Sequence, residues 1–476
     1  MAQPMSATNP FLNFPYGPIQ MECNAYDLLV EGEVPKELHG SLYRNGPNQR
    51  FNPRGDYHLF AGDGMLHAFH IKDGVVNYNN RWARTAKWKI EDRERRNVIN
   101  PMNPFDCEPE YSDFVFSDKD GLANTAVVWH ADRLLTIEEG HPPFEMEPDT
   151  LDSIGSWNYA GKLNSAMTAH PKVDPDTGEM VFFAYMASGP FSADVIIHKV
   201  SPEGLLTDSV VLPTPYSAMV HDFVITENYI MIPIMPISGS LDRAMVGGPP
   251  FAWEPDLGVH LAILPRHGGT AEDVRWIEMD LCFAFHFMNG FDKDGVITID
   301  ACEFETAPLF PTPDGESTGA SHPHLSRWTI DMNDEDARAQ STRLDENEAE
   351  FPQCDPRYMG KPYRHGWYTS PDGKMKSDMA ENDNYYNVVG HYDHETGKED
   401  RYSCGQAMVS EALFVPKSAD AAEGEGYLLS VVTSFETRNS SLFIFDALKV
   451  ATGPLAKVHL SHCVPSGFHG TWRPGA

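Results

Sequence analysis

The sequence has few of the features that mark secreted, membrane-spanning or disulfide-stabilised proteins. Its seven cysteines are scattered and form no Cys-x-x-Cys pair, so they indicate reduced thiols in an intracellular protein rather than a disulfide framework. No apolar run approaches the roughly 18 residues of a membrane-spanning helix. The first residues lack the basic and apolar regions of a signal peptide. We therefore expect a cytoplasmic protein without a transmembrane segment.

Positive charge is also scarce. The 476 residues include 36 lysines and arginines against 69 aspartates and glutamates, and the formal net charge is -33. A field of this sign repels phosphate backbones, so nucleic acid is not an expected partner. It also disfavours docking on an anionic membrane by charge alone, although an apolar patch would still permit peripheral membrane contact. Walker A and dinucleotide motifs are absent from the sequence, so no nucleotide chemistry is indicated.

Helical periodicity is rare, and short strand-like segments recur instead. Apolar runs such as EMVFFAYM, GVITIDACEF and GYLLSVVTSF are bounded by turn residues, among 37 glycines and 37 prolines. At roughly four strands per blade, the pattern predicts one all-β domain over residues 1–476, a seven-bladed β-propeller with a cap of loops and short helices. We expect residues 1–25 to be an N-terminal extension. A large β-sandwich or two β domains is the structural alternative.

Three stretches interrupt this strand pattern. Residues 85–113 are highly charged and then interrupted by prolines, which indicates loops or a short helix. Residues 331–345 are also charged, and we expect a helical turn or two there. Residues 378–387 are expected to form a surface loop.

Three of the 20 histidines occupy the same position in a hairpin pattern. His170 precedes PKVDPDTGE and the strand MVFFAYM, His221 precedes DFVITEN and YIMIPIM, and His286 precedes FMNGFDKDG and VITIDA. Because the first strand of each propeller blade lines the axis, side chains at this position would point toward one centre. His469, in SGFHGTW, is a fourth candidate. A lone histidine at a strand start is otherwise an ordinary structural residue.

The chemistry of a site with four histidines follows from the ligand type. Four neutral imidazoles suit a metal such as Fe(II) or Zn(II). They leave the 2+ charge of the ion uncompensated, so carboxylates are expected to accept hydrogen bonds from the other ring N–H groups. Ligands spread from residue 170 to residue 469 require a scaffold that converges on an axis. Iron with an octahedral preference would keep positions open for O2 and substrate.

At these residues the sequence resembles the carotenoid cleavage oxygenase family. The resemblance runs from about Asp27 to Trp472. It includes ELHGSLYRNGPNQRF and YHLFAGDGMLHAFHI near the N-terminus, and the histidine motifs TAHPKVDPDTGE, MVHDFVITENY, FHFMNGFD and FHGTW. The resemblance implies a seven-bladed propeller with Fe(II) on its axis, held by His170, His221, His286 and His469, under loops that shape a substrate tunnel.

The resemblance also implies roles for residues around the iron. Glu139, Glu350 and Glu411 match three glutamates that accept hydrogen bonds from the ligand histidines. Thr125, in GLANTAVVWH, matches a threonine whose methyl group leans over an open iron position and directs where O2 and substrate approach. For each residue the alternative is an ordinary one, a solvated glutamate in an acidic chain or a threonine that favours a strand.

The sequence departs from the branch it resembles most, the lignostilbene dioxygenases and isoeugenol-cleaving oxygenases. That branch reads a para-hydroxyl group of the substrate with a lysine and a tyrosine. Here Glu138 stands at the lysine position and Pro101 at the tyrosine position. A glutamate accepts a hydrogen bond but repels a phenolate. We therefore expect no strict dependence on a 4-hydroxystilbene or 4-hydroxystyrene, and a stilbenoid, phenylpropenoid or apocarotenoid substrate remains open.

The predicted function is an Fe(II)- and O2-dependent dioxygenase. It would cleave a conjugated C=C bond of a small apolar alkene into two carbonyl products. One alternative is a redox-neutral isomerase or hydrolase of a polyene that uses the same iron. Another is a non-catalytic propeller that binds polyenes.

Overall fold

Short antiparallel strands joined by tight turns make up most of the chain. The computed structural model describes residues 9–55, 57–101, 106–111, 121–374 and 385–475. They divide into two compact units, the first comprising residues 1–169, 371–389 and 400–476, and the second residues 170–370 and 390–399. The predicted single domain and N-terminal extension stay predictions.

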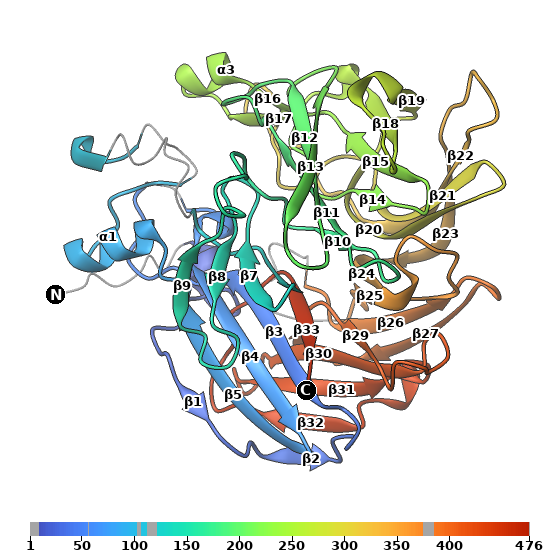
Figure 1. The fold of residues 1–476 in the computed structure, drawn as a ribbon. Coiled ribbons are helices and arrows are strands. Elements are labelled where there is room, and N and C mark those ends of the chain that lie inside the picture. The colour runs from blue at the N-terminus through green and yellow to red at the C-terminus, as the bar shows by residue number, and fades with distance from the viewer. Residues whose placement is uncertain (1–8, 56, 102–105, 112–120, 375–384, 476) are drawn as a thin grey trace. The chain divides into compact units, whose positions relative to one another are not determined.

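The described residues of the first unit form three sheets. One has the order β1 (Asn24–Ala25), β5 (Val75–Trp82), β4 (Gly64–Lys72), β3 (Gly40–Pro47) and β33 (Gly470–Pro474). The next comprises β6 (Ala126–His130), β7 (Arg133–Ile137), β8 (Phe144–Met146) and β9 (Ser153–Ser156). The third has the order β2 (Val30–Gly32), β32 (Ala456–His459), β31 (Ser440–Asp446), β30 (Gly426–Ser434) and β28 (Ala407–Val409), and β29 (Leu413–Pro416) also pairs with β30. Figure 1 shows the last strand, β33, beside β3, so the two ends of the chain share a sheet.

The second unit holds the strands of the middle of the chain. One sheet comprises β10 (Lys172–Val173), β11 (Met180–Tyr185), β12 (Asp194–Val200) and β13 (Leu206–Pro213), and the next comprises β14 (Val224–Ile225), β15 (Tyr229–Ile234), β18 (Val259–Pro265) and β19 (Arg275–Met279). Another comprises β20 (Phe283–Lys293), β21 (Val296–Phe304), β22 (His324–Asp331) and β23 (Gln340–Glu348). Most of the sheet of β24 (Glu350–Cys354), β25 (His365–Ser370), β26 (Val388–Asp393) and β27 (Lys398–Ser403) also belongs to this unit. A two-stranded ribbon pairs β16 (Ile237–Gly239) with β17 (Phe251–Trp253).

Within the described residues, seven sheets have four or more strands each. Each runs largely in chain order with antiparallel neighbours, which is the strand pattern of a propeller blade. The chain is therefore a seven-bladed β-propeller, and the predicted fold class is confirmed. The cap over the metal site stays a prediction.

Helices are few and short. The described α-helices are α1 (Ala86–Glu94) and α3 (Leu241–Met245). Single 3-10 turns lie at Pro10–Leu12, Leu59–Ala61, Pro109–Tyr111, Pro255–Leu257, Ala271–Asp273, Pro356–Tyr358 and Val450–Thr452. None of the helices in the described ranges has the length and apolarity that a membrane crossing requires.

Of the two stretches expected to contain loops or short helices, one does contain a helix and the other ends in a strand. Residues 340–348 form β23 and not a helical turn, because their backbone pairs with β22 from Thr329 opposite Gln340 to His324 opposite Glu348. A polar edge strand of this kind lacks the apolar alternation by which strands are recognised. The short helix expected within residues 85–113 is present as α1. Much of the loop expected at 378–387 lies outside the described residues.

Apolar side chains fill the space between neighbouring sheets of each unit. In the second unit Trp328, Phe283 and Phe287 are buried in a cluster with the β-branched side chains of β18, β19 and β21. Strand β3 of the first unit is buried along its whole length, including the polar residues Arg44 and Asn45. Buried polar groups of this kind require partners. The Asn45 amide donates to the carbonyls of Ala123 and Ala126, at 2.9 and 2.8 Å, and so ties β3 to the segment that enters β6.

Gly64 provides a test of this close packing. Its backbone N–H donates to the Leu122 carbonyl, and a Cβ at this position would lie 2.2 Å from the Ala123 carbonyl oxygen. We predict that Gly64→Ala lowers the free energy of unfolding by about 1–3 kcal/mol, because the segment 122–125 must move. Gly140→Ala is the control, since its Cβ would meet only Glu138, at 4.0 Å. Equal urea midpoints for the two variants would contradict the prediction.

Candidate metal centre

Three histidines of the second unit lie together, each at the first strand of a different sheet. His170 precedes β10, His221 precedes β14 and His286 lies within β20. The Nε2 atoms of His170 and His221 are 3.0 Å apart, and those of His221 and His286 are 3.2 Å apart. The ring centroids of His170 and His286 are 5.0 Å apart. The shared hairpin position seen in the sequence therefore does bring these three imidazoles to one place.

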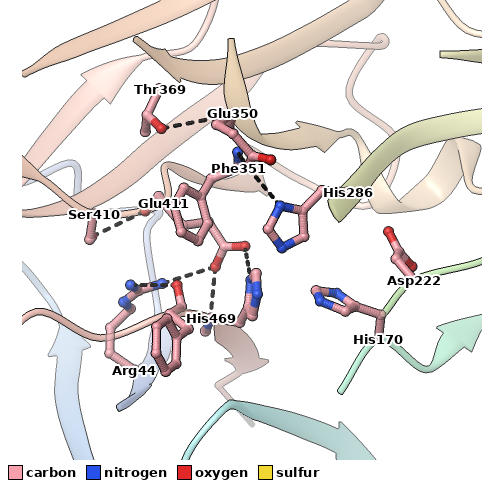
Figure 2. A network of polar contacts seen from close by, with 12 residues as sticks. Arg44, His170, Asp222, His286, Glu350, Phe351, Thr369, Ser410, Glu411 and His469 are labelled. Carbon is pink, nitrogen blue, oxygen red and sulfur yellow. Dashed lines mark hydrogen bonds and ion pairs between the residues drawn. The ribbon is translucent and has the colours of Figure 1, made fainter. Parts of the chain in front are cut away.

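Glu350 fixes the tautomer of His286. Its Oε2 atom accepts a hydrogen bond from His286 Nδ1 at 2.6 Å and another from the Phe351 backbone N–H at 2.5 Å (Figure 2). Thr369 donates from its hydroxyl to the Glu350 carbonyl at 3.0 Å. Because Nδ1 carries the proton, Nε2 of the neutral ring presents a lone pair to the other histidines. This is the protonation pattern of a histidine that ligates a metal through Nε2.

The local backbone explains why Glu350 reaches His286. Strand β24 begins at Glu350 and has a register shift before Gln353. Phe351, within this bulge, has a φ of 49°, a region that a bulky residue occupies only when its surroundings enforce it. Its ring stacks on His286 at a centroid distance of 5.2 Å. The bulge thus turns both the carboxylate and an aromatic face toward the same imidazole.

The donor set of the cluster fits a metal ion. Two nitrogens that bind one ion at about 2.1 Å lie about 3.0–3.4 Å apart, depending on the angle between the bonds. The observed Nε2 separations of 3.0 and 3.2 Å fall in this range. Glu350 is 3 % exposed, and its Oε1 atom has no hydrogen-bond partner in the described structure. A buried carboxylate in this state is costly unless positive charge lies nearby, and a cation held by His286 would supply it.

His469, in the first unit, is held by a second glutamate. Glu411 Oε1 accepts from His469 Nδ1 at 3.0 Å, and its Oε2 accepts from Arg44 Nη1 at 2.9 Å and from the Gly470 backbone N–H at 2.8 Å (Figure 2). Arg44 also donates to the Phe468 carbonyl at 2.8 Å. Burial by itself raises the pKa of Glu411, but its interactions with His469 and Arg44 lower it overall. The lone pair of His469 is thereby assigned to Nε2, as in His286.

Thr125 lies beside His469 in the same unit. Its carbonyl accepts from the His469 backbone N–H at 3.2 Å, and its own N–H donates to the Ile137 carbonyl. Its hydroxyl donates to Asn124 Oδ1 at 2.9 Å. The Asn124 amide is fixed in turn by the carbonyls of Phe60 and Gly62. The threonine side chain therefore has one defined orientation.

Three other predicted site residues have the following places. Glu139 is half-buried and lies just after β7. Glu138 Oε1 accepts from the Leu122 backbone N–H at 3.2 Å and lies 2.5 Å from His141 Nδ1, so its carboxylate already has partners in the first unit. Pro101 is a half-buried turn residue, and residues 102–105, which follow it, lie outside the described part.

Sequence reasoning missed Arg44, Lys172 and Asp222. Arg44 lies in a strand that is otherwise buried, and a buried arginine requires a carboxylate, which is the signal that could have found it. Asp222 directly follows His221, and Lys172 lies two residues after His170. The Lys172 ammonium contacts the Asp222 carboxylate at 2.7 Å. An acidic residue directly after a candidate ligand histidine was the feature of the sequence that could have identified Asp222.

The chain is similar over nearly its whole length to known proteins. The family model described as retinal pigment epithelial membrane protein matches residues 16–474. The chain is 37% identical over 470 residues to lignostilbene-alpha,beta-dioxygenase isozyme III of Sphingomonas paucimobilis, covering 96% of this chain and 95% of that protein. It is 34% identical over 466 residues to isoeugenol monooxygenase of Pseudomonas nitroreducens, covering 96% of each. The crystal structure of Pseudomonas brassicacearum lignostilbene dioxygenase matches with a TM-score of 0.94 at 32% identity and covers 100% of both chains.

The buried pair of Arg44 and Glu411 gives a stability prediction. Arg44→Met leaves a buried carboxylate without its cation, so the free energy of unfolding should fall by about 3–5 kcal/mol. Adding Glu411→Gln to the same chain should recover part of the loss, because no net charge then remains buried. Arg338→Met breaks an exposed pair with Glu278 and should cost under about 1 kcal/mol. Urea unfolding measures all three, and a loss for Arg44→Met no larger than that for Arg338→Met would refute the prediction.

Proposed function

This chain belongs to the carotenoid oxygenase family, and we propose that it is an iron-dependent dioxygenase that cleaves a conjugated carbon–carbon double bond. The observation that carries the proposal is the convergence of the Nε2 atoms of His170, His221 and His286. The names of the relatives support the reaction class, since they include lignostilbene dioxygenase and isoeugenol monooxygenase. The enzyme class and the family agree with the prediction made from the sequence motifs.

We propose Fe(II) as the ion and His469 as the fourth nitrogen ligand. Its ring is held in the same way as that of His286, because the Nδ1 atom of each ring is hydrogen-bonded to a buried glutamate. Glu139 is the third glutamate of the proposed set, as the counterpart of Glu350 and Glu411. Four neutral imidazoles leave the charge of the ion to be balanced by these carboxylates. The cytoplasmic location remains part of the proposal.

The side chains of the site have distinct tasks in this reaction. When bound, ferrous iron supplies the capacity to bind and reduce O2, which no amino-acid side chain has. Glu350 and Glu411 keep the ring protons of His286 and His469 on Nδ1 and so keep both lone pairs directed outward. We propose that the Thr125 side chain, fixed by Asn124, would limit the access of water to the bound iron.

Aromatic rings next to the histidines favour an apolar, conjugated substrate. Phe285 packs edge-on against His221 at 5.5 Å, and Phe351 stacks on His286. Both rings are half-buried, so part of each remains available for contact. Flat conjugated molecules pack well on such surfaces and displace water from them. We therefore propose a stilbenoid, phenylpropenoid or apocarotenoid alkene as the substrate, with O2 as co-substrate.

An oxygen-isotope experiment tests the reaction. Iron-loaded protein should convert a cleavable alkene into two carbonyl products in air and incorporate 18O from 18O2, as measured by mass spectrometry. His286→Ala should lose at least about 100-fold in turnover, because the ligand set is broken. His322→Ala is the control, since His322 is exposed and pairs with Glu348. Full activity of His286→Ala would refute the site, and turnover without O2 would favour a redox-neutral isomerase or hydrolase.

The two departures at Glu138 and Pro101 lead to a substrate prediction. We propose that this enzyme does not require a para-hydroxyl group on its substrate. Glu138 is already bonded to His141 and to the Leu122 backbone N–H, and as a carboxylate it cannot stabilise a phenolate as a lysine would. The kcat/KM values for 4-hydroxystilbene and for unsubstituted stilbene should then agree within about tenfold. A site built around the hydroxyl would discriminate by about 10⁴-fold, and such a ratio would contradict the proposal.

A further inference from the structure

One buried carboxylate joins the three segments that carry His170, His221 and His286. Asp222 directly follows His221, and its Oδ2 accepts from the backbone N–H of Phe287, the residue after His286, at 2.9 Å. Its Oδ1 accepts from Lys172 Nζ, two residues after His170, at 2.7 Å. Three strands that are distant in sequence thus meet at one side chain. Figure 2 shows Asp222 beside His170.

The environment of Asp222 makes these contacts strong and directional. The residue is 2 % exposed, and the Lys172 side chain is 11 % exposed. Oδ1 also accepts from the Phe223 backbone N–H at 2.7 Å, so the carboxylate receives three donors on two oxygens. Hydrogen bonds to an ionised group are short and roughly twice as strong as neutral ones, and burial shields them from water.

The carboxylates of Asp222 and Glu350 differ in whether a cationic side chain neutralises them. Lys172 neutralises Asp222, whereas no cation among the described residues contacts Glu350. Within the part of the chain that the structure describes, Asp222 bonds to the segments beside the histidines and to no imidazole. Its contacts therefore fix where the three segments lie, without adding net charge next to the ligand nitrogens.

We propose that Asp222 is a positioning residue that sets the mutual spacing of His170, His221 and His286. The proposal rests on the metal centre of the proposed function. A carboxylate suits the task because it offers two acceptor oxygens to donors on different strands. An asparagine offers one acceptor, and its amide N–H groups would face either the Phe287 N–H or the Lys172 ammonium. Ligand sites need their geometry held to within a fraction of an ångström, so loss of one contact should be visible at the metal.

Asp300 provides a matched control in the same unit. It is 1 % exposed, pairs with Arg327 at 2.8 Å and accepts from the Tyr363 hydroxyl at 2.5 Å. Neither partner adjoins a histidine of the cluster. The backbone of Asp300 pairs with Asn289 of β20, but its carboxylate binds Arg327 and Tyr363 and not the three segments. Asp300→Asn therefore breaks a buried ion pair of the same kind and measures the general cost of such a break.

The test compares Co(II) binding by the full-length wild type, Asp222→Asn and Asp300→Asn. Metal-free protein is titrated with Co(II) without O2, and the visible absorption bands of cobalt report the ligand geometry. We expect Asp222→Asn to weaken Co(II) binding by about 10–100-fold and to shift these bands. Asp300→Asn should lower the unfolding midpoint yet keep wild-type affinity and bands. Wild-type affinity and bands in Asp222→Asn, or equal changes in both variants, would overturn the proposal.

If Asp222→Asn does not fold, the Lys172→Met variant tests the same proposal. It removes only the bond to the His170 segment and keeps the bond from Phe287. The cobalt bands should still change, and unchanged bands would overturn the proposal. Since cobalt binding is the readout, the result is independent of alkene cleavage. A wild type that binds Co(II) but cleaves no alkene with iron contradicts the proposed function alone, and one that binds no Co(II) contradicts both.

Discussion

The hydrogen bond from a ring nitrogen to a buried carboxylate is the constraint on which the site depends. A neutral imidazole presents a lone pair at only one nitrogen, and its neighbour decides which one. Glu350 takes the Nδ1 proton of His286, and Glu411 takes that of His469. The β24 bulge and the Arg44 contact exist to bring these carboxylates to the rings. Without them the same histidines would be ordinary strand residues.

The acidic groups around the histidines differ in how their charge is compensated. Arg44 and the Gly470 N–H satisfy Glu411, and Lys172 satisfies Asp222. Glu350 has no cationic side chain of its own and keeps one oxygen without a hydrogen bond in the described residues. Buried charge is tolerated only when it is paired. Glu350 is therefore the carboxylate whose charge a bound cation would balance most directly.

The fold was largely predictable because blade strands are marked by local signals. Apolar segments ended by turn residues located β11, β21 and β30, and the repeated histidine position identified the first strand of three sheets. Strand β23 was missed because its exposed, charged residues are held only by pairing with β22. The partners of Arg44 and Asp222 were not predictable either. Arg44 lies 367 residues from Glu411, and Asp222 lies 65 residues from Phe287, and no local pattern encodes such contacts.

X-ray absorption at the iron edge would show whether imidazole nitrogens hold an iron ion in this protein. We expect about one iron per chain, with an inner shell dominated by nitrogen at about 2.1 Å and the outer-shell scattering of several imidazole rings. An inner shell of sulfur, or of oxygen without imidazole scattering, would rule out the proposed histidine site. A protein that retains no iron after anaerobic loading would contradict it as well.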